Sequence, residues 1–161
     1  MDLFGMRKAA KDDIDKIVEI YNSNDKFLSN HLGVTTVDAQ FIRNEMEEME
    51  AVGFLSCVIF DAETDNIVGV LDYKPDATVY LSIVMLNSKF QGKGVGSSVY
   101  KFFEEAMMQS EKQSIRIDVV NEYAGNVVEF WHKQGFLPQK EVQLVWAGKK
   151  SNALVMIKHL V

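Results

Sequence analysis

The sequence has one cysteine, two prolines and no long uninterrupted apolar run. A lone cysteine, Cys57, excludes a disulfide within the chain, and its apolar neighbours indicate a small buried side chain rather than a nucleophile. No segment approaches the roughly 20 apolar residues of a membrane-spanning helix, and residues 1–13 are too charged for a signal peptide. We therefore expect a soluble, cytoplasmic protein with one domain over residues 1–161.

The sequence also lacks an excess of positive charge. It has 17 basic and 23 acidic residues, a net charge of −6, and no basic stripe. This argues against nucleic acid as a partner and suits a cationic acceptor. The densest acidic run, residues 45–50, is expected to be the solvated face of a helix whose methionines point inward. The three histidines lack metal-ligand spacing, so we expect no metal.

The first half of the chain alternates helical and strand patterns. Residues 3–9 form a strand pattern, and Asp12 can cap a helix. The buried face of this helix is Ile14, Ile17, Val18 and Tyr21. A loop is expected over residues 22–33, then a helix from Thr35 or Thr36 to Gly53. Strands are expected at residues 54–60 and 67–73, joined as an antiparallel hairpin, and at residues 78–86.

The second half predicts how the sheet is completed. A helix at residues 94–110 connects strand 78–86 to a strand at 115–120, which is a crossover between parallel strands. Its buried face is predicted to contain Val95, Val99, Phe102, Phe103, Ala106 and Met107. A helix at 126–134 ends at Gly135, and strands at 142–146 and 153–160 form a last hairpin. We therefore predict an α/β (α+β) fold with a mixed central sheet of about seven strands flanked by about four helices.

The most informative motif is Phe90-Gln91-Gly92-Lys93-Gly94-Val95-Gly96-Ser97-Ser98, between strand 78–86 and the long helix. Alternate glycines permit positive φ angles and remove the Cβ atoms that would keep a ligand from the backbone amides. Together with a helix N-terminus they make a site for a diphosphate, the alternative being a tight turn without a ligand. A Walker A loop does not fit because Gly94 follows Lys93, and the dinucleotide motif would need glycine at Ser97.

The pattern Gln-x-x-Gly-x-Gly at residues 91–96 resembles the acetyl-coenzyme A signature of the GCN5-related N-acetyltransferase (GNAT) superfamily. Residues 130–136, Phe-Trp-His-Lys-Gln-Gly-Phe, the ending at residues 155–160 and the predicted order of elements extend the resemblance along the chain. It implies an acyltransferase with acetyl-CoA as cosubstrate. The acetyl group would pass to a primary amine of a small molecule or peptide by direct attack in a ternary complex.

The resemblance also implies which residues bind the coenzyme. Loop amides would hold the pyrophosphate, and the backbone of residues 84–86 would pair with the pantetheine arm. The implied coenzyme-binding residues are Val84, Met85, Leu86, Gln91, Gly92, Lys93, Gly94, Val95, Gly96, Ser97, Asn126 and Lys133. Alternatives stay open for three places: core packing for the side chains of residues 84–86, a helix cap for Asn126, and a solvated lysine for Lys133.

Two catalytic residues are implied. The Leu86 N–H would donate to the thioester oxygen, and Asp118 is similar in place to a carboxylate that acts as the base in some relatives. The alternative for Asp118 is a hydrogen-bonded or edge carboxylate. Weaker base candidates are Tyr80, Tyr123, Glu122 and His31.

Trp131 stands where many relatives have a tyrosine as the acid, so we expect the leaving thiolate to be protonated from water or to leave on the strength of the coenzyme pKa alone. For the same reason a second class of function remains, a coenzyme A-binding regulatory or sensor module without turnover. The acceptor would be shaped by residues 26–36 and the last hairpin. The sequence leaves open its identity and the oligomeric state, a homodimer included.

Overall fold

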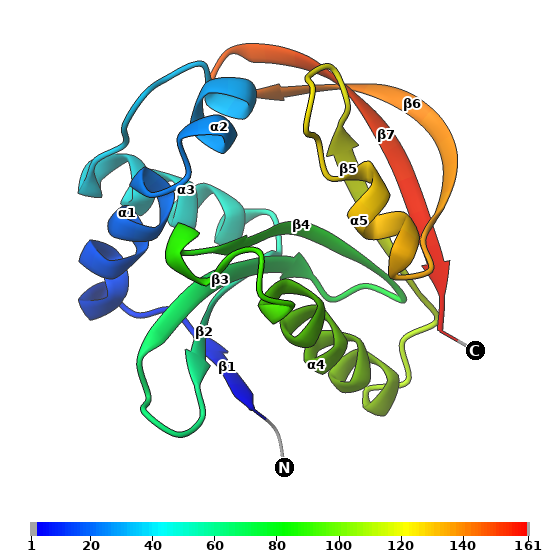
Figure 1. The fold of residues 1–161 in the computed structure, drawn as a ribbon, viewed down its shortest axis with the longest axis horizontal. Coiled ribbons are helices and arrows are strands. Elements are labelled where there is room, and N and C mark those ends of the chain that lie inside the picture. Colours follow the sequence, from blue (N-terminus) through cyan, green and yellow to red (C-terminus); the bar gives the residue numbers. More distant parts are fainter. Residues whose placement is uncertain (1–2, 161) are drawn as a thin grey trace.

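A seven-stranded mixed sheet forms the centre of the computed structural model, which describes residues 3–160 (Figure 1). The strands are β1 (Phe4–Lys8), β2 (Leu55–Asp61), β3 (Ile67–Lys74), β4 (Thr78–Leu86), β5 (Ser114–Val120), β6 (Leu137–Trp146) and β7 (Lys149–His159). Their order in the sheet is β1-β2-β3-β4-β5-β7-β6. Among these pairs of strands only β4–β5 is parallel, because the helix α4 (Val95–Gln109) carries the chain across from one strand to the other. The predicted mixed sheet and crossover are confirmed.

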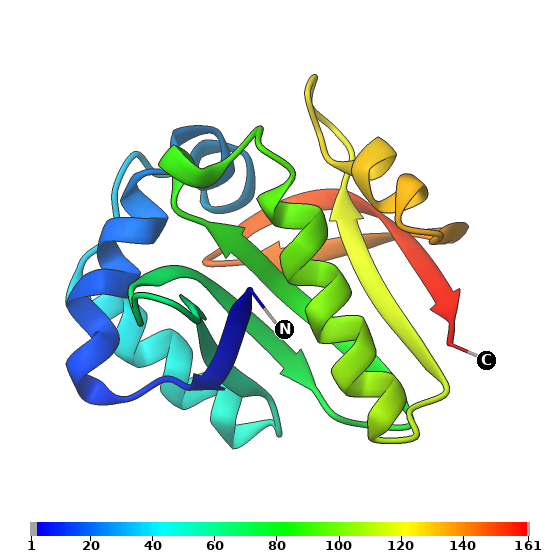
Figure 2. The ribbon, with the colours of Figure 1, turned by 60° about the horizontal axis from the view of Figure 1, so that its bottom comes forward.

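Helices cover both faces of the sheet (Figures 1 and 2). They are α1 (Ile14–Asn22), α2 (Asp25–Phe27), a π-helix (Leu28–Leu32), α3 (Ala39–Ala51), α4 (Val95–Gln109) and α5 (Val128–Lys133). The side chains of α4 and α5 enter one core, and those of α1 and α3 enter a second core on the opposite face. Within the described part of the chain, no helix combines the length and apolarity needed to cross a membrane.

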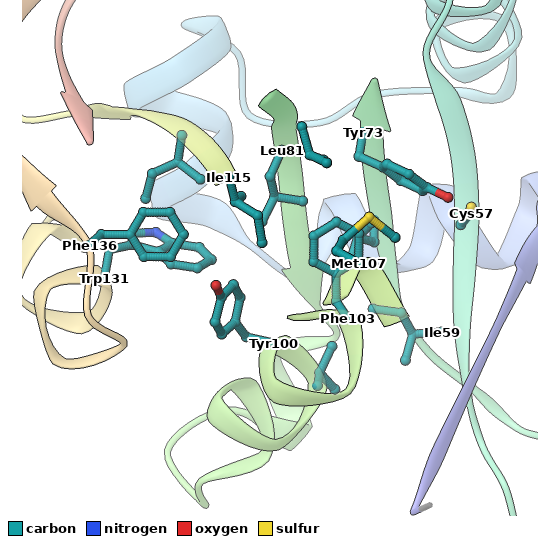
Figure 3. Close-up of a cluster of buried hydrophobic side chains, with 14 of the residues drawn as sticks. Cys57, Ile59, Tyr73, Leu81, Tyr100, Phe103, Met107, Ile115, Trp131 and Phe136 are labelled. Atoms are coloured by element: carbon teal, nitrogen blue, oxygen red, sulfur yellow. The ribbon is translucent and has the colours of Figure 1, made fainter. Parts of the chain in front are cut away.

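The core beneath α4 is rich in aromatic side chains (Figure 3). Phe103 is fully buried, and Val99 and Met107 lie beside it on the predicted face of the helix. The prediction missed Tyr100, which is equally buried. Its ring meets that of Trp131 at 5.3 Å and that of Phe136 at 5.6 Å, while its hydroxyl donates to Glu104. An aromatic body with a polar tip can therefore be buried when the tip has a partner.

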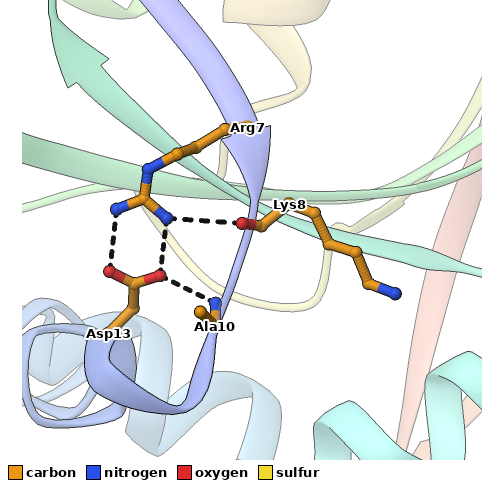
Figure 4. Close-up of polar contacts among 4 residues, drawn as sticks. All are labelled: Arg7, Lys8, Ala10 and Asp13. Atoms are coloured by element: carbon orange, nitrogen blue, oxygen red, sulfur yellow. Dashed lines mark hydrogen bonds and ion pairs between the residues drawn. The ribbon is translucent and has the colours of Figure 1, made fainter.

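The first helix begins differently from the prediction. Asp12 lies exposed in a 3₁₀ turn (Lys11–Asp13), and Asp13, not Asp12, immediately precedes α1. The Asp13 carboxylate is buried and accepts two hydrogen bonds from the Arg7 guanidinium, at 2.7 and 2.9 Å, and one from the Ala10 N–H (Figure 4). The hydrogen bond from Arg7 lowers the pKa of Asp13 despite burial, which acts the other way. This ion pair fixes α1 to β1.

We expect Asp13→Asn to lower the free energy of unfolding by about 1–2 kcal/mol at pH 7, since Arg7 is half exposed and its charge is partly screened. Because the folded-state pKa of Asp13 is depressed, its contribution is present above about pH 3.9 and is lost as pH falls through the folded pKa. Urea unfolding at pH 7 and about pH 3 measures both effects. Asp12→Asn, the exposed neighbour, is the control. An equal loss in both variants would contradict this role.

The helix before β2 begins at Ala39 rather than at Thr35 or Thr36, so this prediction is wrong. The physical cause is Asn22, whose side-chain amide donates to the Val37 carbonyl at 3.0 Å and accepts from the Val37 N–H at 2.8 Å. This pair of bonds satisfies the Val37 backbone outside a helix. Asp38 then caps α3, and its carboxylate accepts the Phe41 N–H at 2.9 Å.

Two further predictions are corrected. Residues 22–33 are not simply a loop, because they contain α2 and the π-helix, whose Leu28 and Leu32 are buried. Gly33, at φ +71°, ends the π-helix rather than a loop. The last hairpin is also longer than predicted. Strand β6 already begins at Leu137, and the prediction missed its first half because this half is an exposed edge without an apolar pattern. The turn contains only Ala147 and Gly148, both with positive φ.

Candidate functional site

Strands β4 and β5 separate after a short paired stretch. They pair only from Thr78 to Tyr80 on β4, opposite residues 114–116 of β5. Pairing with β3 skips Ser82, so the strand bulges there. A bulge bends a strand and reverses which side chains face each side of the sheet. Leu81 accordingly packs under α4, whereas Ile83 packs under α1. The bulge therefore directs the end of β4 away from β5.

The backbone at the end of β4 faces the space between the two strands. Asn87 donates its N–H to Val68 of β3 at 2.9 Å. In an antiparallel pair, alternate residues direct both backbone groups toward the partner or away from it. Val84 and Leu86, opposite Leu71 and Gly69 respectively, therefore direct their N–H and C=O groups away from β3. The sequence predicted that the backbone of residues 84–86 pairs with the pantetheine arm. By the same alternation, Met85 directs its backbone groups toward β3.

The glycine loop has the backbone conformation that the sequence predicted at two of its three glycines. Gly92 and Gly94 have φ angles of +77° and +75°, and a Cβ at either would meet no atom within 4 Å. Gly96 lies in the first turn of α4, where a Cβ would make ordinary contact with Phe130 at 3.6 Å. The left-handed conformation thus requires glycine at Gly92 and Gly94 and leaves open space beside them.

The first turn of α4 presents unpaired donors to this space. The first backbone bond of the helix runs from the Ser98 N–H to the Gly94 carbonyl at 3.2 Å. The amides of Val95, Gly96 and Ser97 precede it and have no intrahelical partner. Their N–H groups and the positive end of the helix dipole lie next to the exposed Lys93. The loop is therefore suited to binding an anion.

Side chains around the loop hold it in place rather than line it. The Gln91 amide donates to Asn24 Oδ1 at 2.6 Å and to the Leu86 carbonyl at 3.3 Å. Asn24 also donates to the Leu86 carbonyl, at 2.9 Å. The Ser97 hydroxyl accepts from Gln134 at 3.0 Å, which joins α4 to α5. Gln91 and Asn24 therefore tie the glycine loop to the end of β4, and the sequence did not single out Asn24.

A cavity of about 80 Å³ lies between the separated strands. Residues from α2, the π-helix, β4, β5 and α5 line it. They include Phe27, His31, Ser82, Val84, Asp118 and Trp131. Met85 lies outside it, buried in the core under α1. Lys133, at the end of α5, is exposed. Asn126 accepts the Val128 N–H at 3.1 Å in the turn before α5, but the N-cap of this helix is Val127, so Asn126 is not the capping residue itself.

Asp118 lines this cavity, but its oxygens already have partners. Arg116 donates to both of them, at 2.9 and 3.0 Å, and the Tyr80 hydroxyl donates at 2.6 Å. Its side chain is only 3% exposed. Burial and this carboxylate raise the pKa of Tyr80, so its hydroxyl keeps its proton. The geometry matches the hydrogen-bonded carboxylate that the sequence left as the alternative to a base.

Phe27 and His31 form an aromatic wall of the cavity. Phe27 stacks on His31 at 4.1 Å and meets the Trp146 ring edge-on at 5.7 Å. Trp146 donates its indole N–H to Glu45 at 3.0 Å. Glu45 is thus half-buried, unlike the exposed Glu47, Glu48 and Glu50 of the acidic run, which are solvated as predicted. Residues from the segment after α1 and from the last hairpin therefore meet at this wall.

The other residues that the sequence offered as a base are Glu122, Tyr123 and His31, and their surroundings differ from those of Asp118. The Glu122 carboxylate accepts the Asn152 N–H, and Tyr123 presents its ring to that of His31 at 5.8 Å. Burial lowers the pKa of His31 below its ordinary value. Among the residues that the structure describes, no three histidine, cysteine or acidic side chains cluster closely enough to hold a metal ion.

A family model and several solved structures match this chain. The model of the acetyltransferase (GNAT) family matches residues 15–136. No curated protein matches the sequence significantly. An acetyltransferase from Thermus thermophilus superposes with a TM-score of 0.77 at 16% identity, covering 99% of this chain and 99% of that one.

Two further solved structures share the fold. Spermidine N-acetyltransferase from Vibrio cholerae, in complex with CoA and spermine, has a TM-score of 0.74 at 14% identity, over 98% of this chain and 96% of that one. The Salmonella typhimurium protein yncA, with its cofactor acetyl-CoA, has a TM-score of 0.67 at 20% identity, over 99% and 95%. Since the family model spans most of the sequence, the chain belongs to the GNAT acetyltransferase family.

Proposed function

We propose that the chain is an N-acetyltransferase that moves the acetyl group of acetyl-CoA to a primary amine by direct attack in a ternary complex. The observation that carries this proposal is the open glycine loop at the start of α4, beside a strand end that has separated from β5. One feature suits a diphosphate and the other suits an extended amide-containing arm. Acetyl-CoA has both in one molecule. Membership in the GNAT family supports the same interpretation.

The loop residues would hold the coenzyme pyrophosphate through their backbone. The space beside Gly92 and Gly94 is open, and the amides of Val95, Gly96 and Ser97 precede the first helical bond of α4. Lys93 adds a positive charge at the rim, and Lys133 is proposed as a second. Gln91 acts indirectly, since its amide is bound to Asn24 and Leu86. Asn126 would shape the start of α5 rather than contact the coenzyme.

The end of β4 would bind the pantetheine arm and the reacting thioester. Val84 and Leu86 direct backbone groups toward the interstrand space, and Val84 lines the cavity there. The Leu86 carbonyl is already bound to Asn24 and Gln91. This leaves its N–H as the group proposed to stabilise the negative charge that develops on the thioester oxygen. Met85 contributes packing on the opposite face.

A second candidate, a coenzyme A-binding sensor module without turnover, is favoured by one observation. Trp131 occupies the position of the expected acid, is only 8% exposed, and packs against Tyr100, Phe130 and Phe136. Its indole N–H is not a practical proton donor to a thiolate. A chain with tryptophan instead of tyrosine at this position could still bind the coenzyme, whereas turnover would depend on protonation of the leaving thiolate by solvent.

Turnover separates the two candidates. We expect the purified chain to release free thiol from acetyl-CoA when a panel of polyamines, amino acids and peptides is supplied, with one acetylated amine formed for each thiol. A thiol reagent follows the first product, and mass spectrometry identifies the second. Calorimetry with CoA alone reports binding. Tight CoA binding without thiol release on any amine would contradict the enzyme and favour the sensor module.

A further inference from the structure

We propose that His31 is the catalytic base of this site and that its Nε2 takes the proton from the acceptor amine. This inference rests on the proposed acetyl transfer and goes beyond it by assigning the proton acceptor. His31 lies on the π-helix between α2 and Gly33. Its ring lines the same cavity as Val84 and Asp118, although these three residues come from three different elements.

The orientation of the imidazole is fixed on two sides. Its ring stacks on Phe27 at 4.1 Å, with 15° between the planes, and meets Tyr123 edge-on at 5.8 Å. Nδ1 lies 3.1 Å from the Phe27 carbonyl oxygen. A carbonyl only accepts hydrogen bonds, so Nδ1 carries the hydrogen and donates. In the neutral ring Nε2 then keeps its lone pair.

The surroundings keep this ring neutral near pH 7. Burial lowers the pKa of His31 most, the bond to the Phe27 carbonyl raises it, and the charge of Lys149 on β7 lowers it further. The other ionisable groups around this side chain are Asp118 on β5, Tyr123 after it, and Glu45 on α3, whose carboxylate accepts the Trp146 indole N–H. Arg116 offsets the charge of Asp118 through its two hydrogen bonds. A neutral imidazole is the form that can accept a proton.

The competing base is less suited to the task. Both oxygens of Asp118 accept hydrogen bonds from Arg116, and one also accepts the Tyr80 hydroxyl proton at 2.6 Å. Proton transfer to Oδ2, which accepts two of these bonds, would require one of them to break, and Oδ1 is held against the positively charged guanidinium of Arg116. His31 Nε2 needs no such rearrangement. We therefore treat Asp118 as a positioning residue that holds Arg116 and Tyr80 at the cavity.

Atoms and charges balance in the proposed step. The amine nitrogen attacks the thioester carbonyl carbon, a C–N bond forms, and the nitrogen becomes positively charged and therefore acidic. His31 Nε2 takes one proton from it, the C–S bond breaks, and the thiolate takes a proton from solvent. His31 then returns its proton to solvent. The products are an N-acetylated amine and free coenzyme A thiol.

Two substitutions and one control test the role of His31. His31→Gln removes the base, and His31→Phe keeps an aromatic ring on Phe27. Both are expected to lower kcat about 100-fold or more at pH 7, the usual contribution of a general base. The dissociation constant for CoA should stay within about twofold, since Nε2 acts only on the amine. His132→Gln, an exposed histidine on α5, should match the wild type.

The pH profile of kcat/KM distinguishes a base from a structural role. The wild type should lose activity as pH falls through the depressed His31 pKa, because the protonated ring cannot accept a proton. This acid limb should vanish in His31→Gln and persist in Asp118→Asn, and imidazole should restore part of the activity of His31→Gln. An acid limb that persists in His31→Gln and vanishes in Asp118→Asn would overturn the assignment and leave the proposed function standing.

A measurement on the chain without any coenzyme tests the tautomer independently. Long-range ¹H–¹⁵N spectra of the ¹⁵N-labelled protein should show the His31 ring with hydrogen on Nδ1 and an unprotonated Nε2 at pH 7. His31→Gln identifies the signal by its disappearance. A ring with hydrogen on Nε2, or a protonated ring at pH 7, would overturn the proposal. A wild type that turns over no amine would overturn both this assignment and the proposed function.

Discussion

Gly94→Asp is expected to weaken CoA binding about 100-fold, because it places a carboxylate where the pyrophosphate is proposed to lie. A Cβ at this position would project into open space beside the first amides of α4. Two unit charges about 4 Å apart repel by about 1 kcal/mol in water and about 4 kcal/mol at a surface dielectric constant of about 20. About 2.7 kcal/mol lies between these limits and corresponds to about 100-fold. Calorimetric titration with CoA measures the loss.

Gly94→Asn is the matched control for this charge. Asparagine has the same size, and both Asn and Asp tolerate the left-handed conformation that Gly94 adopts at φ +75°. Each substitution should cost about 1 kcal/mol of stability, which circular dichroism during urea unfolding measures. The neutral variant should bind CoA clearly more tightly than the charged one. Equal affinity of Gly94→Asp and the wild type would contradict the placement of the pyrophosphate.

Phe103→Ala is expected to lower the free energy of unfolding by about 3–5 kcal/mol, the usual cost of removing a buried phenylalanine. Phe103 is fully buried at the centre of the α4 core, and its ring lies 5.2 Å from that of Tyr73 on β3. The cavity left by the ring would separate the helix from the sheet at this point. Urea unfolding measures the change.

The control for Phe103 lies on the same helix. Met108 is 51% exposed, and Met108→Ala should change the free energy of unfolding by less than about 0.5 kcal/mol. A loss below about 1 kcal/mol in Phe103→Ala would contradict the central place of this side chain. Because α4 also carries the glycine loop, a destabilised Phe103→Ala chain should bind CoA more weakly only under conditions where it unfolds.

The elements that could be predicted from the sequence have local signals. Apolar, β-branched runs identified β2, β3 and β4, and the helical spacing of Val99, Phe103 and Met107 identified α4. The prediction failed where tertiary contacts replace such signals. The exposed first half of β6 has no apolar pattern, and the Asn22 side chain holds Val37 outside a helix, so that α3 begins only after Asp38.

The sequence by itself determined the glycine loop, since a strand, glycines at alternate positions and an amphipathic helix follow one another within residues 78–110. Only the tertiary structure decided what stands beside it. The bulge at Ser82 opens the space between β4 and β5, Arg116 and Tyr80 occupy the oxygens of Asp118, and the π-helix brings His31 to the same cavity. These residues come from segments far apart in the sequence, and their contacts depend on packing between elements rather than on local spacing.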